Sequence, residues 1–218
     1  MSVTPKPLLI FDFDGTLAKT LEAGVEIYNE LAGKYELPTV TEAEVRELRK
    51  LNTRALLDHL NISRLKVVKL GANIRKLLHQ RMDEVELIGG VQDAVLELHR
   101  AGFQLGVLSS NSADNIRMVL GRFDLLECFS FIEAGVSVFG KSHRILKVIR
   151  KNDIDPSQVV YVGDETRDME AARKSKVTGL AVCWGVNERE AMETEDPEYC
   201  IDEPAELIRV AREFEGTR

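Results

Sequence analysis

The feature that most constrains the fold of this chain is an alternation of short apolar segments with longer segments of helical periodicity. The apolar segments are rich in β-branched residues, and Val159-Val160-Tyr161-Val162 has no charged residue at alternate positions. Strands without polar alternation are typical of a parallel sheet that is buried on both faces. Such strands are predicted at residues 8–13, 104–108, 129–133, 159–162 and 178–182. The sequence therefore predicts an α/β fold, in which a doubly wound parallel sheet is covered by helices on both faces.

One long stretch interrupts this alternation. Between the first two predicted strands the sequence shows only helical patterns, at residues 21–35, 42–50, 53–60 and 63–85. Thr41 is followed three residues later by Glu44, which is the spacing of a capping box and predicts the start of a helix. We therefore expect a helical insertion at residues 17–87, after the first strand, and a core domain made of residues 1–16 and 88–218.

The size and charge of the chain narrow its function class. Its 218 residues allow one large domain or a domain with an insertion, and 44% hydrophobic with 30% charged residues is typical of a globular protein. A net charge of −7 opposes attraction to nucleic acid and to anionic membranes. No apolar run approaches the ~18 residues of a membrane span. We therefore expect neither nucleic acid nor membrane as a partner, and any anionic ligand has to be bound by local cations.

The cysteines and histidines carry no obvious chemistry. Cys128, Cys183 and Cys200 are odd in number and lack the spacing of a metal site, which argues against a disulfide framework and favours a reducing cytoplasm. Cys183 and the adjacent Trp184 follow a predicted buried strand, so we expect them to be core or edge residues. His79 falls within a helical pattern and is expected on the surface or in packing.

Two aspartates lie at the end of the first predicted strand, in Asp12-Phe13-Asp14-Gly15-Thr16. Side chains two residues apart on a strand point to the same side, so both carboxylates are expected beyond the carboxyl ends of the strands, where open parallel sheets bind ligands. Two carboxylates this close repel each other, which favours a shared proton or a divalent cation between them. Gly15 allows the backbone to turn sharply at this point.

A second acidic group follows the predicted strand at residues 159–162. The segment Gly163-Asp164-Glu165-Thr166-Arg167-Asp168 adds further carboxylates, chiefly Asp164 and Asp168, at the same edge of the sheet. Carboxylate oxygens are hard ligands of the kind that Mg²⁺ prefers. The alternative for Asp168 is that it caps the helix that follows.

Polar and cationic residues follow two further segments. Ser109-Ser110-Asn111 comes directly after the strand at residues 104–108 and precedes a helical pattern, so its hydroxyls and backbone amides are suited to hold phosphate oxygens. Lys141 precedes another helix and would supply a fixed cation close to developing negative charge.

Taken in order, these motifs resemble the haloacid dehalogenase-like superfamily, in its phosphatase branch with a small helical cap of the phosphoglycolate phosphatase type. The resemblance rests on Asp-Phe-Asp-Gly-Thr at residues 12–16 and Gly-Asp-x-x-x-Asp at residues 163–168, in combination with Ser109 and Lys141. It runs from Leu8 to about Ala211. It implies a Rossmann-like core, with the insertion as a cap over the active site.

The resemblance also implies a reaction, the hydrolysis of a small phosphorylated metabolite by a Mg²⁺-dependent phosphatase through an aspartyl-phosphate intermediate. Asp12 would be the nucleophile, and Asp14 would act as general acid and then as general base. Mg²⁺ would be held by Asp12, by the backbone carbonyl of Asp14 and by Asp164. Asp168 would be a further ligand or a partner of a ligand.

The same resemblance assigns the phosphoryl contacts. Ser109 and Lys141 would bind the transferring phosphoryl oxygens, and Ser110 and Asn111 are predicted as substrate contacts beside them.

Cations in the insertion are candidates for substrate recognition. Arg46, Arg49 and Lys50 share one face of a predicted helix, and Arg54 lies just beyond it. A planar guanidinium can bind a carboxylate or a second phosphate in bidentate fashion, so Arg49 and Arg54 are predicted to contact the substrate. The alternative is a solvated face, because Glu47 lies three residues before Lys50 and can pair with it.

Other functions remain open at this point. A receiver-like regulatory module also uses an aspartate, Mg²⁺ and a lysine on a doubly wound sheet, but the Asp-x-Asp spacing and the insertion favour the enzyme. A phosphomutase or a phosphonate hydrolase of the same superfamily, or an inactive phosphate-binding protein, would have much the same pattern.

Overall fold

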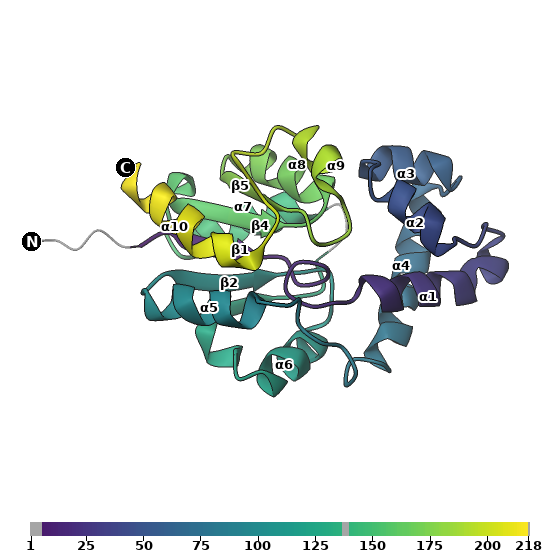
Figure 1. Cartoon of the computed structure of the whole chain (residues 1–218), viewed down its shortest axis with the longest axis horizontal. Helices are drawn as coiled ribbons and strands as arrows, with labels where there is room; N and C mark the ends of the chain where they lie inside the picture. The colour runs from purple at the N-terminus through teal and green to yellow at the C-terminus, as the bar shows by residue number, and fades with distance from the viewer. Residues whose placement is uncertain (1–5, 137–139, 218) are drawn as a thin grey trace, which may run out of the picture.

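A six-stranded parallel sheet forms the centre of the computed structural model, which describes residues 6–136 and 140–217 (Figure 1). The strand order is β3-β2-β1-β4-β5-β6, which is that of a doubly wound sheet, so the predicted fold class is confirmed. The strands are β1 (Leu8–Phe11), β2 (Gln104–Leu108), β3 (Phe131–Glu133), β4 (Val159–Gly163), β5 (Thr178–Val182) and β6 (Tyr199–Ile201). The edge strand β6 was not predicted, because three residues are too few to show a periodicity.

The register of the strands positions the residues that follow them. Phe11, the last residue of β1, is paired with Val107 of β2 and with Val162 of β4. The N–H of Asp12 continues this pairing and donates to the carbonyl of Val162 at 2.8 Å. The loops after these central strands therefore emerge side by side at one edge of the sheet.

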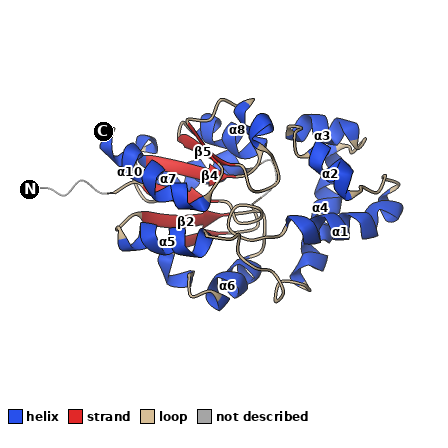
Figure 2. Cartoon of the chain, in the orientation of Figure 1, coloured by secondary structure: helices blue, strands red, loops and turns tan. Residues whose placement is uncertain are grey.

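Both faces of the sheet are covered by helices, as Figure 2 shows. Leu9 and Phe11 pack in a cluster with residues of α5, α6 and α10, whereas Leu8 and Ile10 pack against α7 and α8. Because successive residues of β1 face opposite layers and both layers are apolar, the strand has no polar alternation. These helices and the smaller ones near them are α5 (Val91–Arg100), α6 (Ala113–Arg122), α7 (Lys141–Lys151), α8 (Thr166–Ser175), α9 (Arg189–Glu193) and α10 (Leu207–Gly216), with the 3₁₀ helices η2 (Leu126–Cys128), η3 (Pro156–Gln158) and η4 (Pro204–Glu206).

The helices between β1 and α5 stand apart from the sheet, at the end of the molecule opposite the two chain termini (Figure 1). They are α1 (Leu21–Ala32), η1 (Gly33–Tyr35), α2 (Glu42–Leu48), α3 (Thr53–His59) and α4 (Arg64–His79). Their own small core contains Tyr28, Leu60, Ile62 and Leu70. We call residues 17–87 the insert. Among the described residues, no helix has the length and apolar character needed to cross a membrane.

Local signals in the insert predicted where helices begin better than where they end. The capping box is present, with Thr41 Oγ1 accepting from the N–H of Glu44 at 3.3 Å and Glu44 accepting from the N–H of Thr41 at 2.8 Å. The last helical pattern, however, ends at His79 and not at residue 85. Arg122 of the core donates to the carbonyls of Met82 and Val85, so a tertiary contact holds the segment that follows the helix against the core.

Candidate active site

Asp12 lies at the carboxyl end of β1 and is buried. Its Oδ1 accepts from the N–H of Phe13 at 2.7 Å, and its Oδ2 accepts from Lys141 Nζ at 2.5 Å. Lys141 also donates to Asp168, so one ammonium joins carboxylates that follow two different strands. Burial alone would lower the pKa of Lys141, but Asp12 and Asp168 together raise it well above its ordinary value. The ammonium is therefore a fixed positive charge within the site.

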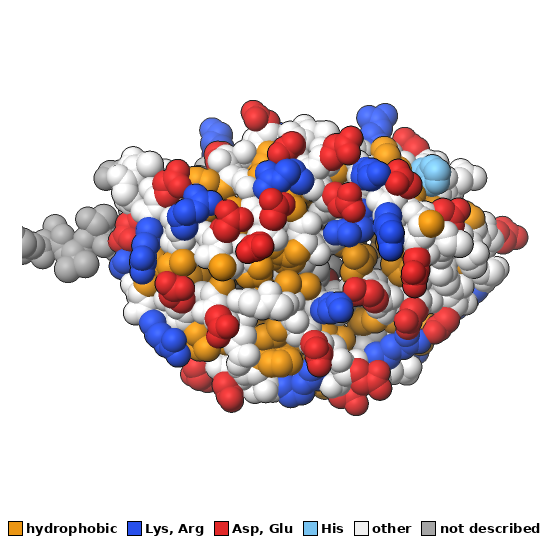
Figure 3. All heavy atoms as spheres, in the orientation of Figure 1, with side chains coloured by type: hydrophobic (Ala, Val, Ile, Leu, Met, Phe, Trp, Pro, Cys, Tyr) orange, Lys and Arg blue, Asp and Glu red, His pale blue; other side chains and the backbone are white. Residues whose placement is uncertain are grey.

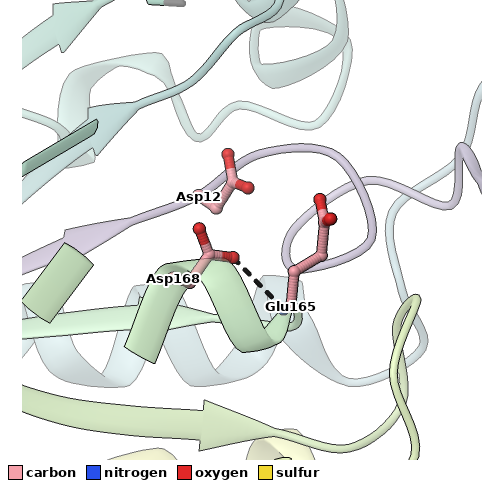
Figure 4. Close-up of side chains that lie close together, drawn as sticks. All are labelled: Asp12, Glu165 and Asp168. Carbon is pink, nitrogen blue, oxygen red and sulfur yellow. Dashed lines mark hydrogen bonds between the residues drawn. The ribbon is translucent and has the colours of Figure 1, made fainter. Parts of the chain in front are cut away.

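Three carboxylates converge beside this lysine. Oxygens of Asp12, Glu165 and Asp168 lie within 4.8 Å of one another, and Figure 4 shows them approaching from the loop after β1 and from the start of α8. Asp168 also accepts from the N–H of Glu165 at 3.2 Å, so it takes part in a capping box as well. Glu165 was not singled out from the sequence as a ligand, although its motif was. An all-oxygen donor set of this kind fits a hard divalent cation such as Mg²⁺.

Asp164 is fully buried and joins three loops. Its Oδ1 accepts from Thr16 Oγ1 at 2.6 Å, in the loop after β1, and its Oδ2 accepts from the N–H of Val186 at 2.7 Å, in the loop after β5. Burial, followed by repulsion from Glu165 and Asp12, raises the pKa of Asp164 well above its ordinary value. Ionisation of this carboxylate is therefore unfavourable unless a further cation lies close to it.

Two glycines allow the loops to approach Asp164 so closely. A Cβ at Gly15 would lie 2.2 Å from Asp164 Oδ2, and one at Gly185 would lie 2.3 Å from the same oxygen. Gly15 also has a φ of +75°, which side chains disfavour. Both positions therefore require glycine for steric reasons.

Asp14 has different partners from Asp12. Asn111 Nδ2 donates to its two oxygens at 2.9 and 3.2 Å, and Ser109 Oγ lies 3.5 Å from its Oδ2. Removal from water, together with repulsion from Asp12, raises the pKa of Asp14 to about 6. A carboxyl with such a pKa can hold and release a proton near neutral pH, as a general acid and base must. Ser110 is half-buried in the same loop.

A chain of hydrogen bonds behind Asp14 was not foreseen from the sequence. Asn111 Oδ1 accepts from Asn115 Nδ2 at 2.7 Å, and Asn115 Oδ1 in turn contacts His79 Nδ1. Because an amide oxygen only accepts, the Nδ1 atom of His79 carries the hydrogen. His79 therefore has a polar role, linking the insert to the side chain that holds Asp14, where a packing or surface role was expected. No local pattern in the sequence signals a contact of this kind.

The cations of the insert separate into two groups. Helix α2 ends at Leu48, so Arg49 and Lys50 lie beyond it and do not extend the predicted face. Arg49 donates to the carbonyls of Gly185 at 2.9 Å and Val186 at 3.3 Å, so it holds the insert against the core. Lys50 pairs with Glu47 at 2.9 Å on the surface, as the solvated alternative predicted.

The same junction contains further hydrogen bonds. Asn187 Nδ2 donates to the carbonyls of Arg49 and Leu51, at 3.1 and 2.8 Å, and the N–H of Thr53 donates to Thr166 Oγ1 at 3.1 Å. The segment between α2 and α3 is thus docked on the loops that follow β4 and β5.

A cavity of about 770 Å³ lies between α3 and the start of α7 and α8. Its lining residues include four cations and two anions, namely Arg54, Lys141, Arg167, Lys174, Asp58 and Glu170. On the face that Figure 3 presents, in contrast, acidic and basic side chains are interspersed. The cavity lining therefore has more cations than anions, although Lys141, Arg167 and Lys174 are each paired with a carboxylate.

Arg167 has one hydrogen-bond donor that the described residues leave unsatisfied. Its guanidinium pairs with Glu165, and its Nε atom is buried without a hydrogen-bond partner among the described residues. A buried guanidinium N–H without a partner is costly, and an anionic ligand would satisfy it.

Comparison with known proteins agrees with this geometry. The model of a family described as haloacid dehalogenase-like hydrolase matches residues 9–182. The chain is 32% identical over 206 residues to a phosphoglycolate phosphatase of Synechococcus elongatus, covering 94% of this chain and 97% of that protein. It is 25% identical over 207 residues to the pyrophosphatase PpaX of Bacillus cereus, covering 93% of this chain and 94% of that protein.

Its fold is similar to a solved structure, the haloacid dehalogenase-like family protein SP0104 from Streptococcus pneumoniae. The TM-score is 0.75 and the identity 19%, over 94% of this chain and 98% of that one.

We predict that Gly185→Ala destabilises the protein by about 1–3 kcal/mol, because the added methyl group overlaps the Asp164 carboxylate. The free energy of unfolding would be measured by urea denaturation. Gly24→Ala is the matched control, since nothing lies within 4 Å of a Cβ at this position of α1. It should raise stability by up to about 1 kcal/mol through helix propensity. Equal effects of the two substitutions would contradict the steric argument.

Proposed function

This chain belongs to the haloacid dehalogenase-like hydrolase family and is a phosphomonoester hydrolase, and we propose that it acts on small phosphorylated metabolites with Mg²⁺, through an aspartyl-phosphate formed on Asp12. The observation that carries this proposal is the contrast between two neighbouring carboxylates. Asp12 is paired with the ammonium of Lys141, whereas Asp14 is held by neutral donors and has a pKa of about 6. Groups whose environments differ in this way are suited to the roles of nucleophile and proton donor.

In the proposed reaction, a carboxylate oxygen of Asp12 attacks phosphorus while the bond to the leaving alcohol breaks. Asp14 gives its proton to the leaving oxygen. It then takes a proton from the water that attacks the aspartyl-phosphate, which releases phosphate and regenerates the carboxylate of Asp12. Asn111 keeps Asp14 in place during both steps. The structure supports this positioning role for Asn111 in place of the predicted substrate contact.

The proposed Mg²⁺ ligands are Asp12, the backbone carbonyl of Asp14 and Asp164, with Asp168 and Glu165 close by. When bound, the ion would offset the repulsion between these carboxylates and the phosphate. Asp164 accepts two hydrogen bonds, one on each carboxylate oxygen. Each oxygen has a second lone pair, so Asp164 can still act as a metal ligand.

Contacts to the phosphoryl oxygens are proposed for Lys141, Ser109 and Ser110. The ammonium of Lys141 has three N–H donors, of which two are directed to Asp12 and Asp168, so one is left for the substrate. Ser109 Oγ accepts from the N–H of Asn111 at 3.1 Å and lies 3.5 Å from Asp14 Oδ2, which places this hydroxyl beside the proposed proton donor.

The cationic cavity supports a substrate that carries a second anionic group. Arg54 reaches it from the insert and Arg167 from the core. Two relatives are named after substrates that carry a second anionic group beside the phosphate. This group is a carboxylate in phosphoglycolate and another phosphate in pyrophosphate. Phosphoglycolate is therefore the first substrate to test. Arg49, which is docked on the core, is proposed to act on substrate only indirectly.

The predicted alternatives of phosphomutase, phosphonate hydrolase and regulatory module stay predictions, as do the cytoplasmic location and the absence of nucleic-acid and membrane partners.

Asp12→Asn should lower Mg²⁺-dependent hydrolysis of phosphoglycolate by on the order of a thousandfold or more, because an amide is a poor nucleophile. Circular dichroism would establish that the fold is retained. A variant that keeps near wild-type turnover would refute the role of Asp12, and a wild type that releases no phosphate from any phosphomonoester would refute the proposed function as a whole.

Asp14→Asn should affect alkyl phosphates far more than aryl phosphates, since a phenolate leaves without much protonation. The expected loss in kcat is roughly 10²–10⁴-fold on an alkyl phosphate and clearly less on an aryl phosphate. Steady-state kinetics on both substrates would measure this difference. Equal losses would indicate that Asp14 serves the structure and not the proton transfer.

Arg54→Gln should discriminate between phosphoglycolate and ethyl phosphate, which has a methyl group in place of the carboxylate. Loss of a charged hydrogen bond, worth about 1.5–3 kcal/mol, lowers kcat/KM roughly 10- to 150-fold on phosphoglycolate alone. Arg49→Gln is the control, because undocking the insert should affect both substrates alike. If Arg54→Gln also affects both alike, the cavity does not recognise the second anionic group.

A further inference from the structure

Two cysteines that are 17 residues apart in the sequence meet at the edge of the sheet. Cys183 directly follows β5, and Cys200 is the middle residue of β6. Their sulfur atoms lie 3.2 Å apart and share a hydrogen bond. The pairing of β5 with β6 brings them together, since Ala181 is opposite Cys200 and the N–H of Cys183 donates to the carbonyl of Ile201 at 3.0 Å. Cys128 is buried and is the last residue of η2, which leads into β3 at the opposite edge of the sheet.

We propose that Cys183 and Cys200 form a reversible disulfide by exchange with a low-molecular-weight disulfide such as oxidised glutathione, and that this bond loosens the docking of the insert on the core. This modification site is additional to the proposed function, and its effect on turnover rests on that function.

The chemistry of the pair suits thiol–disulfide exchange. Both side chains are half-buried, so solvent reaches them. The hydrogen bond from Cys183, followed by attraction to Arg189 against the opposing effect of burial, holds the pKa of the Cys200 thiol below its ordinary value. The same hydrogen bond and burial raise the pKa of Cys183. Cys200 is therefore the better nucleophile, because the thiolate is the attacking form.

The exchange proceeds in two balanced steps. The Cys200 thiolate attacks one sulfur of oxidised glutathione, forming a mixed disulfide and releasing one glutathione thiolate. Cys183 loses its proton to that thiolate, and its sulfur then attacks the sulfur of Cys200 and releases the second glutathione thiolate. Two protein thiols are oxidised by two electrons in total, and one glutathione disulfide is reduced to two glutathione molecules.

The new bond would act on the segment that follows Cys183. A disulfide has a sulfur–sulfur distance of about 2.05 Å, so the two sulfur atoms must approach each other by about 1 Å. Residues 184–188, which we call the docking loop, begin at the next position. Trp184 Nε1 donates to the carbonyl of Thr16 at 3.1 Å, so the first residue of the loop is tied to the loop after β1.

The docking loop has little freedom to absorb this movement. Gly185 is packed directly against Asp164, and the N–H of Val186 donates to that carboxylate at 2.7 Å. The carbonyls of Gly185 and Val186 accept from Arg49, and the N–H of Glu188 donates to the carbonyl of Arg49 at 3.0 Å. A shift at Cys183 therefore reaches both the insert and the acidic site.

The test begins with the thiols. The folded, full-length protein is equilibrated in glutathione buffers of graded oxidation, its free thiols are alkylated, and the products are identified by intact and peptide mass spectrometry. We expect a species that carries a single alkyl group, on Cys128, and that is otherwise two hydrogen atoms lighter than the reduced protein because Cys183 and Cys200 are linked. Treatment with dithiothreitol before alkylation should restore three alkylated thiols. Full alkylation of all three thiols in the most oxidising buffer, or a disulfide that includes Cys128, would overturn the proposal.

The effect on docking is measured by hydrogen exchange. The amides of Val186 and Glu188 should exchange faster in the oxidised protein, because their acceptors lie on Asp164 and on the insert. Unchanged exchange in the fully oxidised protein would overturn the second half of the proposal. This readout does not depend on turnover, so it remains decisive even if the enzyme assay fails.

Matched variants isolate the pair. Cys183→Ser and Cys200→Ser should lose both the disulfide and the oxidation-dependent exchange, whereas Cys128→Ser should behave as the wild type. Phosphoglycolate turnover should fall several-fold on oxidation and recover with dithiothreitol, in the wild type and in Cys128→Ser only. A reduced enzyme without turnover would count against the proposed function, and a turnover unaffected by a proven disulfide would count against the effect on docking.

Discussion

The ion pairs of Lys141 with Asp12 and Asp168 are the interaction on which the rest of the site depends. All three side chains are buried, and their charges compensate one another where water cannot. Removal of the lysine would leave two buried carboxylates without a counter-ion, which is strongly destabilising. The ammonium thus joins the loop after β1, the start of α7 and the start of α8, and it keeps the carboxylate of Asp12 in place at the sheet edge.

The carboxylates around this group outnumber the cations that are paired with them. Asp14, Asp164, Glu165 and Asp168 follow two adjacent strands, and burial raises the pKa of Asp14 and Asp168 to about 6. The proposed divalent cation, together with a proton on Asp14, would offset the electrostatic cost of this arrangement. The repulsion between these buried carboxylates destabilises their ionised forms, and the same repulsion favours the binding of a cation and the retention of a proton.

The insert is attached to this site by polar contacts. Arg49 and Asn187 join it to the docking loop, and His79 joins it through Asn115 to Asn111. Apolar residues also join the insert to the core, since Ile27, Leu78, Met82 and Val85 belong to the same buried cluster as Leu9 and Phe11 of β1. A substitution at Gly185 in the docking loop, or the proposed disulfide at Cys183 directly before it, is therefore expected to affect the insert and Asp164 together.

The sequence by itself determined the sheet, the insertion and the acidic motifs, because these depend on neighbouring residues. Periodicity indicates strands and helices, and Asp12, Asp14, Asp164 and Asp168 lie at or shortly after the ends of two predicted strands, whose parallel pairing brings these ends together. The tertiary structure alone decided which side chains touch across the fold. Arg49 docks on carbonyls while Arg54 lines the cavity, His79 reaches Asn115, and Cys183 meets Cys200. Such contacts are set by strand register and by the packing of the insert, to which no local pattern of residues corresponds.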